Sequence, residues 1–277
     1  MPELPEMQAL SERLEAIYGG ATLKRFDLLQ FSSLKTVEPS PSDLYGTKVT
    51  ALGRRGKYVF FAMGDKRLMF HLSQGGRVDI EDPPKATKPK GSIVRLHFDG
   101  RPSMLIKEFG TERKAALWVL ASEDPGPLER LGPEPDSEAF AAFIRTGQDK
   151  RRLHTMLRDQ RTVAGIGRGF ADDILHDAKL APFDPLSSLN DEQREQLLQS
   201  SRRALDAALA RERQREGGLP TKMQGRFTVH GKYGEACSRC KNTLRRVSYE
   251  AYEVTYCPTC QTRGKVLADR RTSRFLK

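Results

Sequence analysis

The chain has 277 residues and a mass of 31.2 kDa, which is enough for two domains that each bury a core. Hydrophobic residues make up 38% of the composition, charged residues 30%, and the net charge is +11. No run of about 18 apolar residues occurs, and the start of the chain carries no basic-then-apolar signal segment. These features argue against a membrane-spanning or secreted protein, and we expect a cytoplasmic location.

The first part of the chain predicts one helix followed by short strands. Apolar residues recur with a helical period over residues 6–17, and a Gly-Gly pair ends that helix. From about residue 21 to residue 119, short β-type runs alternate with turns, and the clearest runs cover 49–52, 57–61, 68–72 and 93–98. Several strands at this spacing predict a sandwich or a barrel.

Two Pro- and Gly-rich segments, 124–127 and 132–135, predict a domain boundary, beyond which the period is helical. Helices are expected over residues 137–145, 152–157, 170–176 and 191–213. The three glycines of segment 163–169 let backbone amides approach a neighbour closely, although a plain interhelical turn is the simpler interpretation. A β-hairpin is expected after Phe227. We therefore predict three segments, 1–123, 124–224 and 225–277.

All four cysteines fall in one pattern, Cys-x2-Cys-x16-Cys-x2-Cys, formed by Cys237, Cys240, Cys257 and Cys260. Two thiolate pairs on tight turns, separated by the length of a hairpin, can close a tetrahedral Zn²⁺ site. No cysteine is left over, so a disulfide framework is not expected. Four protein ligands leave no open coordination position. We therefore expect one structural Zn²⁺ ion that stabilises the fold and does no chemistry.

Positive charge is concentrated in two segments. Residues 211–277 contain 16 Lys/Arg against 6 Asp/Glu, and residues 145–168 contain 7 against 2. Concentrated positive charge is typical of a protein that binds a polyanion. Because no strongly amphipathic basic helix stands out, we expect nucleic acid rather than a membrane as the partner.

The first six residues, MPELPE, combine a potential nucleophile with carboxyl groups. Aminopeptidases usually remove an initiator Met that precedes Pro, which would leave Pro2 with a secondary amine. An α-amino group has a pKa of about 8, so much of it is free base near neutral pH. Such an amine attacks a sugar aldehyde carbon to give an iminium, and the neighbouring carboxyl of Glu3 can supply protons. A disordered, Pro-containing start is the alternative when these residues are considered alone.

Taken together, these features resemble the formamidopyrimidine-DNA glycosylase/endonuclease VIII family of base-excision repair enzymes. The resemblance covers nearly the whole chain. It rests on motifs in a fixed order, together with the cysteine spacing: residues 1–6 (MPELPE), 54–58 (RRGKY), 71–76 (HLSQGG), 131–135 (LGPEP), 165–167 (GIG) and 231–235 (GKYGE).

The resemblance implies an α+β, multidomain fold. An N-terminal β-sandwich with flanking helices precedes a helix-two-turn-helix domain with a zinc β-hairpin. It also implies that the partner is double-stranded DNA containing damaged bases or abasic sites, with the damaged nucleotide flipped out of the stack. We expect a monomer in the bacterial cytosol or nucleoid.

The same resemblance implies the roles of individual residues. Pro2 attacks C1′ of the damaged nucleoside, Glu3 protonates the sugar ring oxygen, and Glu6 is a supporting carboxylate. Lys57 matches a lysine that contacts phosphate, and the iminium permits β-elimination, which nicks the strand 3′ to the lesion. The implied DNA-binding residues are His71, Gln74, Arg113, Lys114, Gly167, Arg168, Arg245 and Tyr252.

Several positions depart from the family pattern. The member specialised for 8-oxoguanine fills the hole left by the flipped base with Met, Arg and Phe, and the matching positions here are Gln74, Arg113 and Lys114. The plug is therefore more polar. Arg168 stands where an Asn usually holds a phosphate beside the lesion, and it brings a full charge and a longer reach. Tyr252 stands where an Arg promotes δ-elimination.

Three further features bear on specificity and DNA binding. Arg245 and Arg246 are the candidates to replace the missing hairpin arginine. The segment between residues 218 and 227 is short for the loop that covers 8-oxoguanine in the specialised branch. A basic tail at 268–274 is expected to contact the DNA backbone. We predict weak excision of 8-oxoguanine opposite cytosine and better activity on abasic sites, formamidopyrimidines or oxidised pyrimidines.

Two other functions stay open at this point. A non-catalytic member of the same family would bind damaged DNA without excising a base. The departures favour this alternative, whereas the retained Pro2, Glu3 and Lys57 argue against it. A zinc-ribbon transcription or RNA-binding protein would explain the charge and the cysteines, but it leaves the first 120 residues unexplained.

Overall fold

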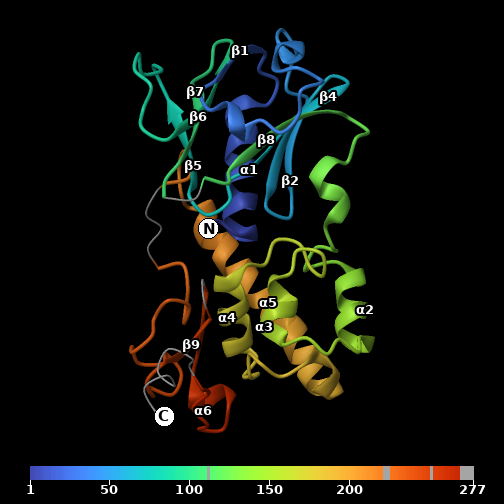
Figure 1. Ribbon diagram of the computed structural model, residues 1–277, viewed down its shortest axis with the longest axis vertical. Coiled ribbons are helices and arrows are strands. Elements are labelled where there is room, and N and C mark those ends of the chain that lie inside the picture. Colours follow the sequence, from blue (N-terminus) through green and yellow to red (C-terminus); the bar gives the residue numbers. More distant parts are fainter. Residues whose placement is uncertain (111–112, 221–224, 250–251, 269–277) are drawn as a thin grey trace. The chain divides into compact units, whose positions relative to one another are not determined.

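The computed structural model describes residues 1–110, 113–220, 225–249 and 252–268. The chain forms two compact units (Figure 1): unit 1 is Met1–Arg130 with Leu209–Met223, and unit 2 is Leu131–Ala208 with Gln224–Lys277. The finer division into 1–123, 124–224 and 225–277 stays a prediction. No helix in the described part of the chain is both long and apolar enough to cross a membrane.

Unit 1 contains two four-stranded antiparallel sheets, which confirms the predicted sandwich. The first sheet has the order β2-β3-β4-β8, with strands at Ala51–Arg55, Tyr58–Met63, Lys66–His71 and Ala116–Ala121. The second has the order β1-β6-β7-β5, with strands at Leu23–Leu28, Ser92–Phe98, Ser103–Glu108 and Gly76–Glu81. The predicted strands at 57–61, 68–72 and 93–98 are confirmed, and β2 begins two residues later than predicted.

Helix α1, Leu4–Tyr18, packs against the first sheet through β2. It begins two residues earlier than its apolar period predicts, because Pro5 is tolerated in the first helical turn. Its last residue, Tyr18, is fully buried and packs against Phe98, with ring centroids 4.4 Å apart and the rings tilted by 33°. Phe61 of β3 lies 6.1 Å from the same Phe98 ring. Burial of each such side chain contributes about 1.5–3 kcal/mol, so this contact of helix and strands is central to unit 1.

Helix α5 covers Asp191–Arg213. The segment after it belongs to unit 1 and pairs with strand β5 at the edge of the second sheet. The Leu219 backbone N–H donates to the Val78 carbonyl (2.7 Å), and the Val78 N–H donates to the Leu219 carbonyl (3.3 Å). Leu219 is fully buried within the unit 1 core. Arg13 of α1 donates to the Gly217 carbonyl at 2.8 Å. Unit 1 is therefore built from two stretches of chain that are distant in sequence.

Unit 2 is helical, as the period beyond residue 136 predicts. Helices α2, α3 and α4 cover Glu138–Thr146, Leu153–Arg158 and Arg168–Asp177. Ser137 caps α2 by accepting a hydrogen bond from the Phe140 N–H at 3.2 Å. Apolar side chains of all three helices and of α5 form one core. Its fully buried members include Phe140, Leu157, Phe170 and Leu197. The four predicted helices are confirmed.

The predicted C-terminal hairpin is also confirmed. Strands β9, Arg245–Tyr249, and β10, Tyr252–Tyr256, pair antiparallel, and helix α6, Pro258–Gln261, follows. A small core beside the hairpin contains Val229, Leu244, Cys237 and Cys257. Short 3₁₀ helices occur at Phe31–Ser33, Pro41–Leu44, Gly126–Arg130 and Leu186–Ser188.

Candidate functional site

The residues at the start of the chain are buried and held by the first turn of α1. Pro2 is buried, and Glu3 and Glu6 are only 2% and 1% exposed. The two glutamates form a reciprocal capping box. The Glu3 backbone N–H donates to Glu6 Oε2 at 2.8 Å, and the Glu3 carboxylate accepts from the Glu6 backbone N–H. The positive end of the helix dipole stabilises both negative charges, so two carboxylates are fixed beside Pro2.

Lys57 lies in the turn that joins β2 to β3 and is 4% exposed. Gly56, directly before it, has φ +56°, a conformation that favours glycine. Arg54 of β2 donates to Gln8 Oε1 of α1 at 2.8 Å. Because this contact lies two residues from Glu6 and three residues from Lys57, it joins the start of α1 to the strand that carries the lysine. Lysine is rarely buried unless it is paired, so the burial of Lys57 distinguishes this turn from an ordinary surface turn.

His71 lies at the end of β4, opposite Tyr58 in the sheet, and the two rings lie 4.7 Å apart. Burial lowers the pKa of His71 to about 4, and the positive charge of Lys57 acts in the same direction. The imidazole is therefore neutral at neutral pH. The Ser73 backbone N–H donates to His71 Nδ1 at 3.3 Å, so the hydrogen of the neutral ring lies on Nε2. His71 thus offers an N–H donor.

The structure brings the Gln74 turn against the segment that ends β7. The Phe109 N–H donates to the Gly75 carbonyl at 3.1 Å. A Cβ atom on Gly75 would lie 1.9 Å from the Phe109 carbonyl oxygen, so only glycine permits this approach. Gln74 is exposed on the turn, and the chain continues from Phe109 towards the other two plug candidates.

Those two candidates, Arg113 and Lys114, are also exposed. The Glu108 carboxylate accepts from the Lys114 backbone N–H at 2.9 Å, which fixes the end of this segment. Arg113 Nη1 donates to Gln30 Oε1 at 3.3 Å. Gln74, Arg113 and Lys114 therefore belong to two adjoining segments of unit 1.

In unit 2, the glycine-rich turn is held by one side chain and leads directly into α4. Gln160 accepts from the Gly165 N–H at 2.9 Å and donates to the Ile166 carbonyl at 2.6 Å. Gly165 has φ +97°, which favours glycine. Gly167 is the N-cap of α4 and Arg168, which is partly exposed, is its first residue. The predicted turn therefore connects α3 to α4 and leads directly into the first turn of α4.

The two arginines of β9 have different surroundings. Arg246 forms an ion pair with Glu253 across the hairpin, with 2.9 Å between Nη1 and Oε2. Its guanidinium also lies 4.3 Å from the centre of the Tyr233 ring. Arg245 is exposed. Tyr252 is the first residue of β10, but its side chain lies outside the described residues, as do residues 221–224 of the short segment and most of the basic tail.

The four cysteines converge, and their Sγ atoms all lie within 4.8 Å of one another. Sulfur ligands at about 2.3 Å from a tetrahedral Zn²⁺ lie about 3.8 Å apart. Two pairs lie 3.4 Å and 4.0 Å apart, Cys240–Cys257 and Cys237–Cys260, which is much longer than a disulfide bond of about 2.05 Å. The cluster can hold one metal ion, and its thiolate donors suit zinc.

Helix α4 carries buried polar residues that the sequence reasoning missed. Asp173 accepts hydrogen bonds from the backbone N–H groups of Thr228, Val229 and His230 at 2.5, 2.9 and 3.2 Å. Burial raises the pKa of Asp173, and the three donors act in the opposite direction. His176 lies 3.2 Å from Cys237, measured from Nε2 to Sγ. The sequence did carry a signal for them: Asp172, Asp173 and His176 interrupt the apolar residues of this helix.

Asp172 and Gly169 hold the same helix against the C-terminal segment. Asp172 pairs with His230 Nδ1 at 2.6 Å and accepts from the Thr255 N–H at 3.1 Å. A Cβ atom on Gly169 would lie 2.1 Å from the Phe227 ring. Helix α4 therefore contacts both the glycine-rich turn at its start and the hairpin segment along its length.

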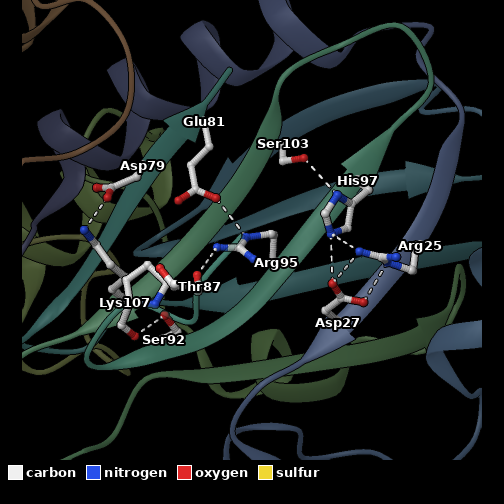
Figure 2. Close-up of polar contacts among 11 residues, drawn as sticks. Arg25, Asp27, Asp79, Glu81, Thr87, Ser92, Arg95, His97, Ser103 and Lys107 are labelled. Carbon is white, nitrogen blue, oxygen red and sulfur yellow. Dashed lines mark hydrogen bonds and ion pairs between the residues drawn. The ribbon is translucent and has the colours of Figure 1, made fainter. Parts of the chain in front are cut away.

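A second polar cluster lies on the β1-β6-β7-β5 sheet (Figure 2). His97 lies 2.9 Å from both Asp27 and Ser103, through Nε2 and Nδ1 respectively. The order Ser–His–Asp is that of a hydrolase triad, but Ser103 is only 4% exposed. A buried Arg95–Glu81 ion pair, 2.8 Å long, lies beside it. We interpret this cluster as a structural network because a substrate does not reach the Ser103 hydroxyl.

Comparison with known proteins agrees with these features. Residues 1–111 match the family described as the formamidopyrimidine-DNA glycosylase N-terminal domain, and residues 131–217 match the formamidopyrimidine-DNA glycosylase H2TH domain. A formamidopyrimidine-DNA glycosylase of Thermus thermophilus is 31% identical over 279 residues, which is 95% of this chain and 100% of the relative.

Solved structures of the same kind match closely. The MutM (Fpg) protein of Thermus thermophilus has a TM-score of 0.80 and 30% identity, covering 94% of this chain and 99% of that chain. The Fpg of Lactococcus lactis, non-covalently bound to DNA that contains an AP site, has a TM-score of 0.82 and 25% identity with the same coverage. Since domain matches, whole-length identity and fold agree, the chain belongs to the formamidopyrimidine-DNA glycosylase/endonuclease VIII family.

Proposed function

We propose that this protein is a base-excision repair DNA glycosylase with an associated AP-lyase activity on double-stranded DNA that contains oxidised bases or abasic sites. The observation that carries the proposal is the capping box of Glu3 and Glu6, which fixes two buried carboxylates beside Pro2. Family membership supplies the substrate class, since the relatives are named formamidopyrimidine-DNA glycosylases.

The reaction begins after removal of Met1 has freed the Pro2 amine. The amine attacks C1′ of the damaged nucleoside as the bond from C1′ to the base breaks, and the base leaves as an anion that takes a proton from water. The proton lost by the Pro2 nitrogen passes to the Glu3 carboxylate. Glu3 then gives this proton to the ring oxygen as the sugar opens, which gives an iminium between Pro2 and C1′. Loss of a proton from C2′ then breaks the bond from C3′ to oxygen. The strand is thereby nicked by β-elimination, and water hydrolyses the iminium.

The remaining residues bind the DNA in this proposal. Lys57 and the Nε2–H group of His71 donate to phosphates beside the lesion. In unit 2, the amides at Gly167 and the Arg168 guanidinium bind a further phosphate at the start of α4, where the helix dipole favours negative charge. Arg245 is exposed on the hairpin and is the arginine that we assign to backbone contact there, because Arg246 is engaged with Glu253.

Zinc is the metal that best suits the four thiolates. Cys237, Cys240, Cys257 and Cys260 would hold one Zn²⁺ ion, which stabilises the fold of the segment around it. All four cysteines lie in one tight cluster, and with all four bound to the ion the site would leave no position for a substrate.

Lesion preference follows from the plug. Gln74, Arg113 and Lys114 are polar and exposed, so they offset lost base stacking, which costs a few kcal/mol per extruded base, less well than apolar side chains. Lesions that are already poorly stacked or paired should therefore be preferred over 8-oxoguanine opposite cytosine. A panel of lesion-containing duplexes resolved on a denaturing gel tests this. Fast excision of 8-oxoguanine ending mostly in a one-nucleotide gap would contradict both the plug assignment and the predicted lack of δ-elimination.

Borohydride trapping on abasic DNA tests the mechanism. The Met-processed protein should crosslink covalently, whereas a Pro2→Gly variant and a form with an N-terminal tag should not. Equal crosslinking by a protein that retains Met1 would move the chemistry to another amine. Tight binding to abasic DNA without any crosslink would instead support a non-catalytic damaged-DNA-binding member of the family, which the polar plug and Arg168 favour.

A further inference from the structure

One buried contact joins helix α4 to the cysteine cluster. His176 Nε2 lies 3.2 Å from Cys237 Sγ, and the two residues are 3% and 0% exposed. The group of metal-ligand atoms that lie within 4.8 Å of one another contains the four Sγ atoms but no atom of His176. His176 therefore lies beside the candidate metal centre and not in its ligand set.

The chemistry of a metal-bound cysteine fixes the direction of this hydrogen bond. A cysteine that binds a metal is a thiolate, which has no hydrogen and can only accept. The hydrogen between the two atoms must then lie on Nε2, whichever charge the ring carries. Four thiolates and one divalent ion leave a net charge of −2 in a site where Cys237 and Cys257 are buried. An N–H donor stabilises such a charge in surroundings of low dielectric constant.

A second contact holds the same end of the helix. Arg239, which lies between Cys237 and Cys240 in the sequence, donates to the backbone carbonyl of His176 at 2.9 Å. Its guanidinium also lies 3.4 Å from the Asp177 carboxylate. A cation at the C-terminus of a helix interacts favourably with the helix dipole. The loop that carries the first two cysteines is therefore attached to α4 both through a sulfur atom and through an arginine.

We propose that His176 is a positioning residue for the metal centre: its Nε2–H group donates to the Cys237 thiolate, slows release of the metal and lowers the nucleophilicity of that sulfur. Partners in the shell around metal ligands typically change metal affinity by 10- to 100-fold. The proposal does not depend on glycosylase activity, since it concerns the binding of the metal alone.

A pair of variants separates the hydrogen bond from packing. His176→Phe removes the N–H group and keeps a ring, whereas His176→Gln can place an amide N–H near the position of Nε2. His97→Gln is the matched control, because His97 lies in unit 1. The measurements are the rate of zinc transfer to a coloured chelator and the sulfur-to-metal charge-transfer band of the Co²⁺-substituted protein.

We expect His176→Phe to release zinc at least about 10-fold faster and to shift the charge-transfer band to lower energy, because a thiolate without its donor is easier to oxidise. Alkylation at Cys237, located by mass spectrometry, should also become faster. His176→Gln should recover much of both effects, and His97→Gln should match the native protein. If His176→Phe lowered the melting temperature but left the band and the rate of metal release unchanged, His176 would only contribute packing and the proposal would be overturned.

The native protein provides a test that does not require any variant to fold. In a ¹¹³Cd-substituted, ¹⁵N-labelled sample, a hydrogen bond from Nε2–H to a metal-bound sulfur carries a scalar coupling between the cadmium nucleus and that hydrogen. We expect this coupling at His176. A neutral ring with its hydrogen on Nδ1, together with no coupling, would contradict the proposal directly.

Discussion

Glu3, Glu6 and Lys57 are ionisable residues of unit 1 with at most 4% of their surface exposed. A buried charge is costly unless hydrogen bonds or an opposite charge compensate for it. For the glutamates, the compensation is visible in the capping box and the positive end of α1. Because these contacts are local, the carboxylates can be changed chemically while their shape is kept, which allows chemistry and stability to be tested separately.

Glu3→Gln should separate the two roles of this side chain. The amide oxygen still accepts from the Glu6 N–H, so the free energy of unfolding should change by only about 1 kcal/mol. The proton donor is lost, and excision should fall by about 100-fold or more. Urea unfolding and single-turnover excision measure the two quantities. Glu6→Ala is the comparison, because it removes one half of the capping box. Excision that survives Glu3→Gln would remove Glu3 from the mechanism.

His71 should make unit 1 sensitive to acid. Its pKa is about 4 in the folded protein, because of burial and then the charge of Lys57, and about 6.5 in an unfolded chain. Between these values the unfolded state binds more protons, so this contribution to stability is complete above about pH 6.5 and is lost as the pH falls towards 4. Urea unfolding between pH 7.5 and about 4 should show this loss, and His71→Gln should flatten it. Equal slopes for both proteins would contradict the assignment.

Among the elements of unit 2, helix α4 joins the glycine-rich turn to the segment that contains the cysteines. It begins at the glycine-rich turn and presents Asp172, Asp173 and His176 to the segment that contains the cysteines. Asp173 accepts three backbone N–H groups. An acceptor of this kind fixes the path of a loop that has no regular secondary structure of its own. Removal of the acceptor should therefore affect the loop more than the helix.

Asp173→Asn is the corresponding experiment. An amide offers one oxygen to three donors and turns its NH₂ group towards at least one of them, which leaves buried N–H groups unsatisfied at about 1–3 kcal/mol each. We expect a loss of several kcal/mol in the stability of unit 2 and faster amide exchange at residues 228–230, measured by hydrogen exchange with mass spectrometry. Asp206→Asn, at an exposed position of helix α5 in the same unit, is the control. Unchanged exchange at 228–230 would show that the three bonds do not hold the loop.

Across the whole molecule, a strongly basic stretch of sequence and the cysteine cluster belong to the same unit. Residues 225–277 contain 12 Lys/Arg against 4 Asp/Glu. A chain with this charge repels itself, so a metal that closes it contributes directly to its folding. DNA affinity and metal content should therefore change together.

Cys257→Ser tests this link. The variant should lose zinc, bind duplex DNA far more weakly and keep unit 1 folded. Metal analysis, fluorescence anisotropy over a range of salt concentrations, and the borohydride crosslink at high protein concentration measure the three effects. The dependence of log affinity on log salt concentration should also become less steep, because fewer phosphates are neutralised. Unchanged duplex affinity after loss of the metal would show that the hairpin is not a DNA contact.

Local patterns predicted those features whose causes are local. Helix α5 has the bounds that its sequence predicts, Asp191–Arg213, because it is rich in Arg, Glu, Gln, Leu and Ala. The cysteine spacing likewise predicted a cluster that can hold a metal. By contrast, the contact of His176 with Cys237 and that of His97 with Asp27 join residues 61 and 70 positions apart. No period or motif relates such positions, so only the fold reveals them.

The pairing of Leu219 with Val78 has a consequence for how the protein is made. On the ribosome, the first 130 residues emerge long before Leu219. Until Leu219 is made, Val78 of strand β5 lacks this backbone partner and the unit 1 core lacks one of its buried side chains. Unit 1 is complete only when the residues that follow α5 have been synthesised. Helix α5 must therefore emerge before the half of the protein that carries Pro2 can close, and translation itself delays the assembly of that half.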